Sequence, residues 1–302
     1  MKKPIRFFVK KEKIVRDRSE KILMIIVFPL LLLWSFTLLY PFFWAFLNSF
    51  KSTIEYYRNS FSFPEKWMFE NWTKAIVFLE VPKSDPWESA GFIELLWNSI
   101  WRTFGDAIIY LMSVSVLSYV ISKYSNPWTK AIYVVSLTVM MLPIIGAMPS
   151  YYRLNAQLGL INTPLRLILG IGSGIGGMEI LVMISFFSGI SWTYAEAVFI
   201  DGGGHWTVFL KVMLPQAIPI LIALFVTRAI SSWNDYLGTL MYMPDFPTLA
   251  SGLYIIENAS LTANNRPLYF ACMLYATIPP VALYWGFNGK IMNNVSIGGI
   301  KG

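Results

Sequence analysis

An uncharged apolar run covers residues 22–50 and constrains this chain more than any other feature. A helix needs about 20 apolar residues to cross the roughly 30 Å hydrocarbon core of a membrane, and this run is longer. It is also too long for the apolar region of a cleavable signal peptide, and no small-residue cleavage site follows it. We therefore expect it to be retained as a membrane span.

The composition agrees with several such spans. Of the 302 residues, 56% are hydrophobic and 14% are charged, and the mean hydropathy of +0.54 argues against a soluble globular domain. We predict an all-α membrane protein with a basic segment at residues 1–21 and a single transmembrane domain at residues 22–302. Its six transmembrane helices are expected near residues 23–49, 95–122, 131–151, 166–188, 217–242 and 268–289.

The basic residues predict the orientation of these spans. Nine of the 24 lysines and arginines lie within the first 21 residues, which is typical of a cytoplasmic flank attracted to anionic membrane lipid and not of a nucleic-acid arm. Alternating spans then place residues 123–130, 189–216 and the C-terminal tail on the same side. This arrangement puts 14 lysines and arginines inside and 8 outside, so both termini are expected in the cytoplasm.

Several chemistries are disfavoured by residues that the sequence lacks. The single Cys272 excludes an internal disulfide and a multi-cysteine metal site, and the single His205 leaves little for imidazole chemistry. A membrane-embedded metalloenzyme is therefore the weakest interpretation. No G-x-x-x-x-G-K-[ST] phosphate loop is present, so we do not expect the chain itself to hydrolyse ATP.

One polar-rich stretch, residues 194–215, interrupts the apolar pattern on the predicted cytoplasmic side. Residues 192–200 predict a short helix with Glu196 and Ala197 exposed, and three glycines at 202–204 permit a sharp reversal. A second short helix at residues 205–214 is expected to end at Pro215.

This stretch resembles the cytoplasmic signature loop of binding-protein-dependent ABC importer permeases. That loop runs roughly E-A-A-x-x-D-G-A, then about nine residues, then I-x-L-P. The matching residues here are Glu196, Ala197, Asp201, Gly202, Leu214 and Pro215, with apolar Phe209 and Val212 between them. Val198 and Gly203 replace two alanines of the pattern.

The resemblance implies a type I ABC importer permease fold and a mechanism. The coupling loop would cover residues 192–215, and its first helix, from Tyr194 to Asp201, would lie in a groove of a separate ATPase subunit. Glu196 would supply a charged anchor and Ala197 a close packing surface, with Gly202 and Gly203 forming the turn. No cofactor is expected in this chain, since ATP and Mg would be used by the partner ATPase dimer. The other implied partners are a second, non-identical permease and an extracytoplasmic sugar-binding protein, in a prokaryotic cytoplasmic membrane.

The substrate class is also implied only by resemblance. Trp233, Asn234 and Asp235 are similar to the W-N-D turn of sugar-type importer permeases, and the tail at 293–302 is similar to their G-x-x-x-G-x-x-K-G ending. The subgroup transports oligosaccharides of the maltose or complex-polysaccharide type. A permease for a non-sugar solute and an ion-coupled secondary transporter remain alternatives, although the second would be expected to show an internal repeat that we do not find.

Charged residues within the predicted spans are candidates for the translocation cavity. Arg102 and Asp106 lie one helical turn apart, and we expect them to form a structural pair in preference to a substrate contact. Glu179 and Arg228 are both placed near the midplane, where charges are costly and usually face a partner or water. They are expected to pair or to line one cavity, and a purely structural pair is the alternative. Trp233, Asn234 and Asp235 join this candidate set, although such a cluster could simply cap its span.

Two predicted spans contain residues that bend or break helices. Pro143 and Pro149 predict a kink in the third span, because each proline frees a backbone carbonyl. The fourth span carries Gly170, Gly172, Gly174, Gly176 and Gly177, which favour close helix approach or a broken helix lining a passage.

Overall fold

The computed structural model describes residues 18–85, 87–141, 146–169, 177–258 and 265–295, and these residues are mostly helical. Four of the described helices are long and apolar enough to cross a membrane. They cover Leu23–Ser49, Phe92–Lys123, His205–Trp233 and Arg266–Gly289. A fifth candidate is the pair Met178–Ser188 and Thr193–Ile200, whose two helices are bent by 68°. The sequence prediction of several apolar spans is thus confirmed at this coarser level.

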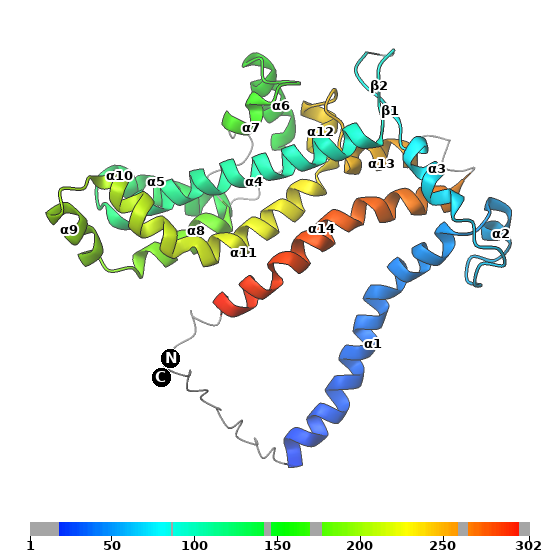
Figure 1. Ribbon diagram of the computed structural model, residues 1–302. Coiled ribbons are helices and arrows are strands. Elements are labelled where there is room, and N and C mark those ends of the chain that lie inside the picture. The colour runs from blue at the N-terminus through cyan, green and yellow to red at the C-terminus, as the bar shows by residue number, and fades with distance from the viewer. Residues whose placement is uncertain (1–17, 86, 142–145, 170–176, 259–264, 296–302) are drawn as a thin grey trace, which may run out of the picture.

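Three long helices lie side by side along the molecule (Figure 1). They are α4 (Phe92–Lys123), α11 (Leu214–Trp233) and α14 (Arg266–Val295). The first helix, α1 (Arg18–Ser49), starts away from the bundle, and its C-terminal end meets the start of α14. Its residues 23–43 are all exposed, and they are apolar on every side of the helix. Such a surface is stable only against lipid or another apolar protein surface.

The third and fourth predicted spans are each divided between two helices. The third corresponds to α5 (Pro127–Met141) and α6 (Ala147–Gln157), and the fourth to α7 (Leu165–Leu169) and α8 (Met178–Ser188). Gly146, with φ of 81°, immediately precedes α6 and prevents a continuous α5–α6 helix. Pro143 and the glycines at 170, 172, 174 and 176 lie outside the described residues.

The fifth predicted span is also interrupted. It consists of α11, which ends at Trp233, and α12 (Tyr236–Tyr242). The side chain of Asn234 donates to the Ile230 carbonyl at the end of α11, while Asp235 accepts from the Gly238 N–H at the start of α12. Two adjacent capping residues therefore convert one apolar run into two helices.

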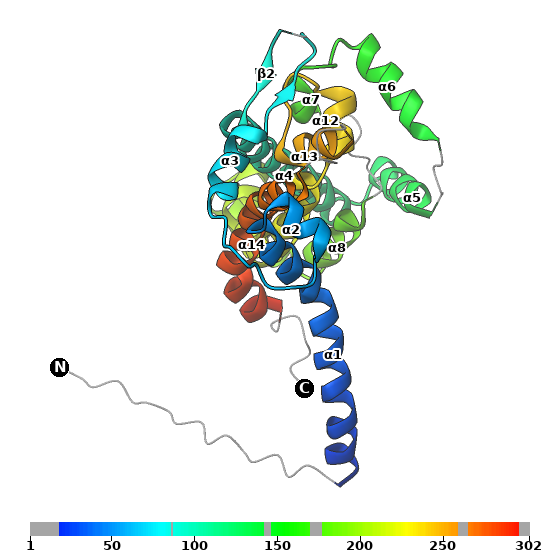
Figure 2. The same ribbon diagram turned by 90° about the vertical axis from the view of Figure 1, so that its right-hand side faces the viewer.

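Small elements gather at one end of the long helices. They are α2 (Thr53–Arg58), α3 (Glu70–Phe78), the antiparallel strands β1 (Val81–Pro82) and β2 (Ser89–Ala90), and α13 (Leu249–Asn258). They cover one apolar core that contains Leu79, Leu95 and Trp233. The hairpin, α6, α7 and α12 all lie on the side of α4 opposite α1 (Figures 1 and 2).

A second apolar core lies at the other end of the molecule. It is built where α4, α8 and α11 meet α9 (Thr193–Ile200) and α10 (His205–Val208). Tyr119, Phe187, Phe209 and Met213 are among its buried side chains. This core fixes the position of the polar-rich stretch singled out in the sequence.

Candidate functional site

The predicted loop helix is present as α9 and is closed by a tight cap. Gly202 adopts a φ of 80°, and its N–H donates to the Phe199 carbonyl. The N–H of Gly203 donates to the Val198 carbonyl at 2.8 Å. These two bonds form a Schellman motif, which satisfies carbonyls that a helix end leaves free. The chain therefore reverses directly after α9 in a hydrogen-bonded turn.

One side of α9 is buried and the other is free. Ala195 is fully buried in the second core, whereas Tyr194, Glu196, Ala197, Ile200 and Asp201 are exposed. Ile200 is 85% exposed, which is unusual for an isoleucine beside a packed core. The predicted exposure of Glu196 and Ala197 is confirmed. The helix thus presents a mixed apolar and acidic face at the end of the molecule (Figure 1).

The two departures from the family pattern lie against each other. A Cβ atom on Gly203 would lie 2.5 Å from Cγ1 of Val198, a distance that side chains do not tolerate. Valine at 198 therefore occupies the space that an alanine side chain at 203 would need. The sequence alone presents them as separate changes, and the structure shows that they belong together.

An aromatic cluster attaches α9 to the end of α4. Tyr124, directly after α4, packs against Trp192 and His205, and its hydroxyl lies 2.7 Å from Nδ1 of His205. Phe199 of α9 packs on the same imidazole, with ring centroids 5.0 Å apart. Sequence reasoning missed Tyr124. The single histidine has a structural role here, because it joins α9, through Phe199, to the end of α4, through Tyr124.

The loop continues without a break into α11, which corrects one prediction. Residues 205–208 form α10, residues 209–213 form a single π-helical turn, and α11 starts at Leu214. Pro215 therefore lies in the first turn of α11 and does not end the preceding helix. The wider π-helical turn precedes it, so the missing N–H of proline is accommodated. The exposed helix α9 is thus connected through a short helical segment to a long apolar helix.

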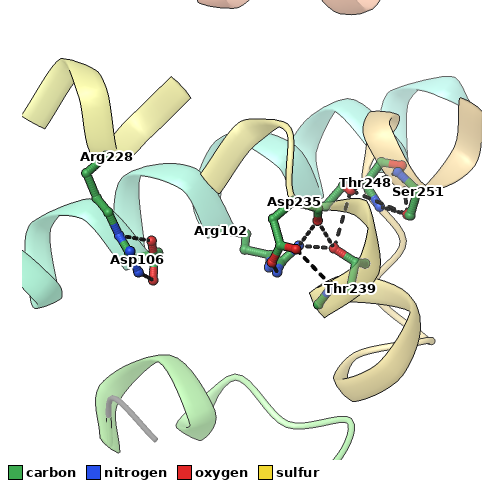
Figure 3. A network of polar contacts seen from close by, with 8 residues as sticks. Arg102, Asp106, Arg228, Asp235, Thr239, Thr248 and Ser251 are labelled. Carbon is green, nitrogen blue, oxygen red and sulfur yellow. Dashed lines mark hydrogen bonds and ion pairs between the residues drawn. The ribbon is translucent and has the colours of Figure 1, made fainter. Parts of the chain in front are cut away.

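A polar stripe on α4, formed by Arg102, Asp106 and Tyr110, is the second candidate site, and Figure 3 shows the first two with their partners. Arg102 does not pair with Asp106 as predicted. Its Nη2 donates to Oδ2 of Asp235 at 2.6 Å, and its Nη1 donates to Thr239 on α12. The spacing of four residues does put both α4 side chains on one face. Facing helices bring partners of opposite charge to that face, and those contacts replace the local pair.

Asp106 instead binds Arg228 of α11. Nε and Nη2 of Arg228 donate to the two carboxylate oxygens at 2.8 and 2.9 Å, a bidentate pair. The same guanidinium lies 4.2 Å from the centre of the Tyr110 ring, and the Tyr110 hydroxyl donates to Glu179 at 3.3 Å. The expected direct pair of Glu179 and Arg228 is therefore not formed. The two residues are linked through Tyr110.

Comparison with known proteins identifies the class to which these two sites belong. Residues 112–288 match the family described as binding-protein-dependent transport system inner membrane component. This chain belongs to that family. The matched region includes α8, the candidate coupling loop and α11.

Individual relatives of this permease cover nearly its whole length. It is 28% identical over 272 residues to the diacetylchitobiose uptake system permease protein NgcG of Streptomyces coelicolor, covering 89% of this chain and 86% of that protein. It shares its fold with a chain of a bacterial ABC transporter involved in the import of the acidic polysaccharide alginate, with a TM-score of 0.73 and 21% identity over 91% and 98% of the two chains. A further alginate transporter structure, in complex with a pentasaccharide-bound periplasmic protein, gives a TM-score of 0.59 at 14% identity over 90% and 94%.

The remaining predicted residues of the permease have defined places. Trp233 is buried, and its Nε1 donates to the Ala276 carbonyl of α14 at 3.1 Å. Asn234 is an exposed capping residue, and Asp235 both caps α12 and holds Arg102. Within the predicted cavity set, Asp235, Arg228 and Glu179 are thus placed beside α4, whereas Trp233 packs toward α14.

Proposed function

We propose that this permease forms the membrane passage of an ATP-driven importer that takes up an oligosaccharide, and that α9 couples it to a separate ATPase dimer. The observation that carries this proposal is the construction of α9. Its outer face is exposed, its end is closed by the Schellman motif, and its inner face is anchored to α4 and α11. A helix anchored in this way transmits a displacement imposed by a partner without unfolding.

The polar contacts suggest how a displacement of α9 reaches the passage. Movement of α9 passes through the π-helical turn into α11, which carries Arg228 about 21 Å further along the helix at 1.5 Å per residue. Arg228 holds Asp106 of α4, and Asp235 after α11 holds Arg102. Rotation of α11 therefore changes the contacts along the polar stripe of α4, and with them the access to the passage from either side.

The full assembly follows from this assignment. Residues 22–302 form one permease domain of six spans, and the basic residues 1–21 lie with the C-terminal tail in the cytoplasm against anionic lipid. The α9 end faces the cytoplasm of a prokaryotic cell. A second, non-identical permease completes the passage, and the ATPase subunits bind ATP and Mg. An extracytoplasmic binding protein delivers the sugar at the end that carries the hairpin and α13.

Sugar transport is supported by the relatives of the chain. One is named for diacetylchitobiose uptake and another belongs to an alginate importer. Both are transporters of linked sugars, which favours an oligosaccharide over other solutes. The W-N-D turn formed by Trp233, Asn234 and Asp235 is consistent with the same subgroup.

A size change on the outer face of α9 tests the coupling. Ala197→Trp should prevent seating in an ATPase groove, so the tagged permease should lose most of the ATPase that copurifies with it. Ala156→Trp is the matched control, because Ala156 is also an exposed helical alanine but lies in α6, away from α9. ATP-dependent sugar uptake into vesicles should fall with the first variant only. Uptake that is driven by an ion gradient without ATP would favour the secondary transporter and overturn the proposal.

A further inference from the structure

Arg166 of α7 has no carboxylate partner among the described residues. Its guanidinium carbon lies 4.0 Å from the centre of the Tyr242 ring, and its Nε is buried with no hydrogen-bond acceptor in the part of the chain that the structure describes. Arg228 also lies over a tyrosine ring, yet it makes two hydrogen bonds to Asp106. The arginine–tyrosine stack at Arg228 is thus completed by a carboxylate, whereas the stack at Arg166 lacks one among the described residues.

The surroundings of Arg166 carry an excess of positive charge. Its neighbour Leu167 approaches Gly105 of α4, which places Arg166 beside the polar stripe, close enough to Arg102 for the two charges to repel each other. Asp235 and Asp106 both act on Arg166, but Asp235 is already bound by Arg102 and caps α12, and Asp106 is already bound by Arg228. Both carboxylates that act on Arg166 are therefore already engaged by other arginines.

A half-buried guanidinium in this position is costly without a counter-ion. In a membrane protein such charges face a partner or water, and leaving a buried donor unpaired costs more than a paired donor gains. The partner must satisfy a planar fork of N–H groups, which a carboxylate matches best. Since the described residues do not provide that carboxylate, a ligand that enters the passage is the natural source.

The adjacent aromatic rings extend this site. Tyr152 of α6 lies beside Tyr242, with ring centroids 6.0 Å apart, and its side chain is partly exposed. Aromatic faces pack on the apolar face of a sugar ring and on guanidinium groups. Both tyrosines and Arg166 lie on elements found on the side of α4 that also carries the hairpin (Figures 1 and 2).

We infer that Arg166, supported by Tyr242, binds the carboxylate of an acidic sugar unit during transport, so that the solute of this importer is a uronate-containing oligosaccharide. This inference rests on the proposed function and adds the chemical class of its substrate. The binding of the sugar carboxylate is reversible, because the stacking contact with Tyr242 still stabilises the Arg166 guanidinium after the sugar leaves.

The test uses the complete complex in vesicles with its own binding protein. Uptake of trigalacturonate and trimannuronate is compared with uptake of maltotriose and cellotriose. We expect Arg166→Gln to lower acidic sugar uptake by about tenfold to a hundredfold, the range for losing a charge-assisted hydrogen bond, and Arg166→Lys to restore part of it. Arg153→Gln is the matched control, since it removes the same charge from the exposed surface of α6.

The outcomes separate the two proposals. Uptake of neutral trisaccharides alone, unchanged in Arg166→Gln, would overturn the acidic substrate while leaving the importer function intact. Acidic uptake that is equal in Arg166→Gln and Arg153→Gln would also overturn the role of Arg166. If no sugar of either set were taken up although the ATPase copurifies, the proposed oligosaccharide function would fail, and this inference with it. Copurification of the ATPase with Arg166→Gln verifies that the variant is folded.

Discussion

Single residues of this permease are positioned by partners that lie far away in the sequence. The i, i+4 spacing of Arg102 and Asp106 predicts a local pair, but each binds a residue more than 120 positions away. Hydropathy marks these charges as unusual and says nothing about which helix faces them. The sequence could therefore identify the members of the polar stripe, and only the packing of α11 and α12 on α4 determines the pairs.

Gly177 provides a test at this scale. A Cβ atom at Gly177 would lie 2.5 Å from the Tyr110 hydroxyl and 2.6 Å from Oε2 of Glu179. We expect Gly177→Ala to separate these two groups and to destabilise the protein by about 1–3 kcal/mol, the usual cost of overpacking. Tyr110→Phe in the same chain should recover part of the loss, because it removes the hydroxyl. Unfolding in mixed detergent micelles, followed by tryptophan fluorescence, measures both.

A suitable comparison is Gly91→Ala. Gly91 has no heavy atom within 4 Å of the corresponding Cβ position, so this variant should unfold like the parent protein. Equal stability of the Gly177 and Gly91 variants would show that the contact between Tyr110 and Glu179 is not tight in the membrane.

At the scale of elements, the sequence predicts correctly a helix whose end is marked by specific turn residues. The helix at 192–200 and the reversal at the glycines were predicted from residue types alone, and α9 and its cap confirm both. Pro215 misled the same reasoning, since a proline usually ends a helix. The π-helical turn that accommodates it depends on packing of Phe209 and Met213 into the second core, which no local rule contains.

The contact between Val198 and Gly203 gives the prediction for this scale. Gly203→Ala alone should disrupt the cap of α9 and reduce ATPase retention and uptake together by about tenfold, as expected for a steric cost of 1–2 kcal/mol at the proposed coupling contact. The double variant Val198→Ala with Gly203→Ala should recover part of both losses, because it removes the Cγ1 contact but leaves the Val198 carbonyl oxygen at 3.0 Å and Cγ2 of Thr207 at 3.3 Å from the added Cβ. Gly204→Ala, where the added methyl group meets nothing within 4 Å, is the control. Failure of the double variant to recover would mean that position 203 needs glycine for another reason.

For the whole molecule, hydropathy predicts where the apolar spans lie but not where they break. Three segments distant in sequence meet at Asp245, after α12. Its carboxylate accepts from the Ser84 N–H of the hairpin at 2.9 Å and from the side chain of Asn162 in the α6–α7 loop. No periodicity in the sequence relates these three positions. They join the hairpin to the face that carries α7 and α12.

Acid should loosen this junction. Hydrogen bonds from Ser84, chiefly, and from Asn162 hold the pKa of Asp245 below its usual value. A lowered pKa stabilises the junction at neutral pH, and the contribution is lost as the pH falls below about 4. A spin label on Trp87→Cys, which replaces a residue that is 94% exposed, should become mobile in that range. The native Cys272 is buried and should not react.

Variants separate the contributions to this transition. Asp245→Asn should make the label more mobile already at pH 7 and leave a smaller acid step. The hydrogen bond with Glu94 raises the pKa of Lys83, so its contribution is lost only as the pH rises through that pKa, and Lys83→Gln should leave the acid step unchanged. An unchanged acid step in Asp245→Asn would show that the carboxylate does not hold the hairpin.

The pair at 198 and 203 also restricts the history of this loop. If an ancestor carried alanine at both positions, as the family pattern has, valine arriving first would have carried the steric cost, because its γ-methyl would have met the alanine side chain at 203. Glycine at 203 before valine at 198 is the order that avoids this cost, and once valine was present a return to alanine at 203 carried the same cost. Close relatives that carry glycine at 203 with alanine at 198 would be the surviving intermediates, whereas relatives with valine and alanine together should be rarer.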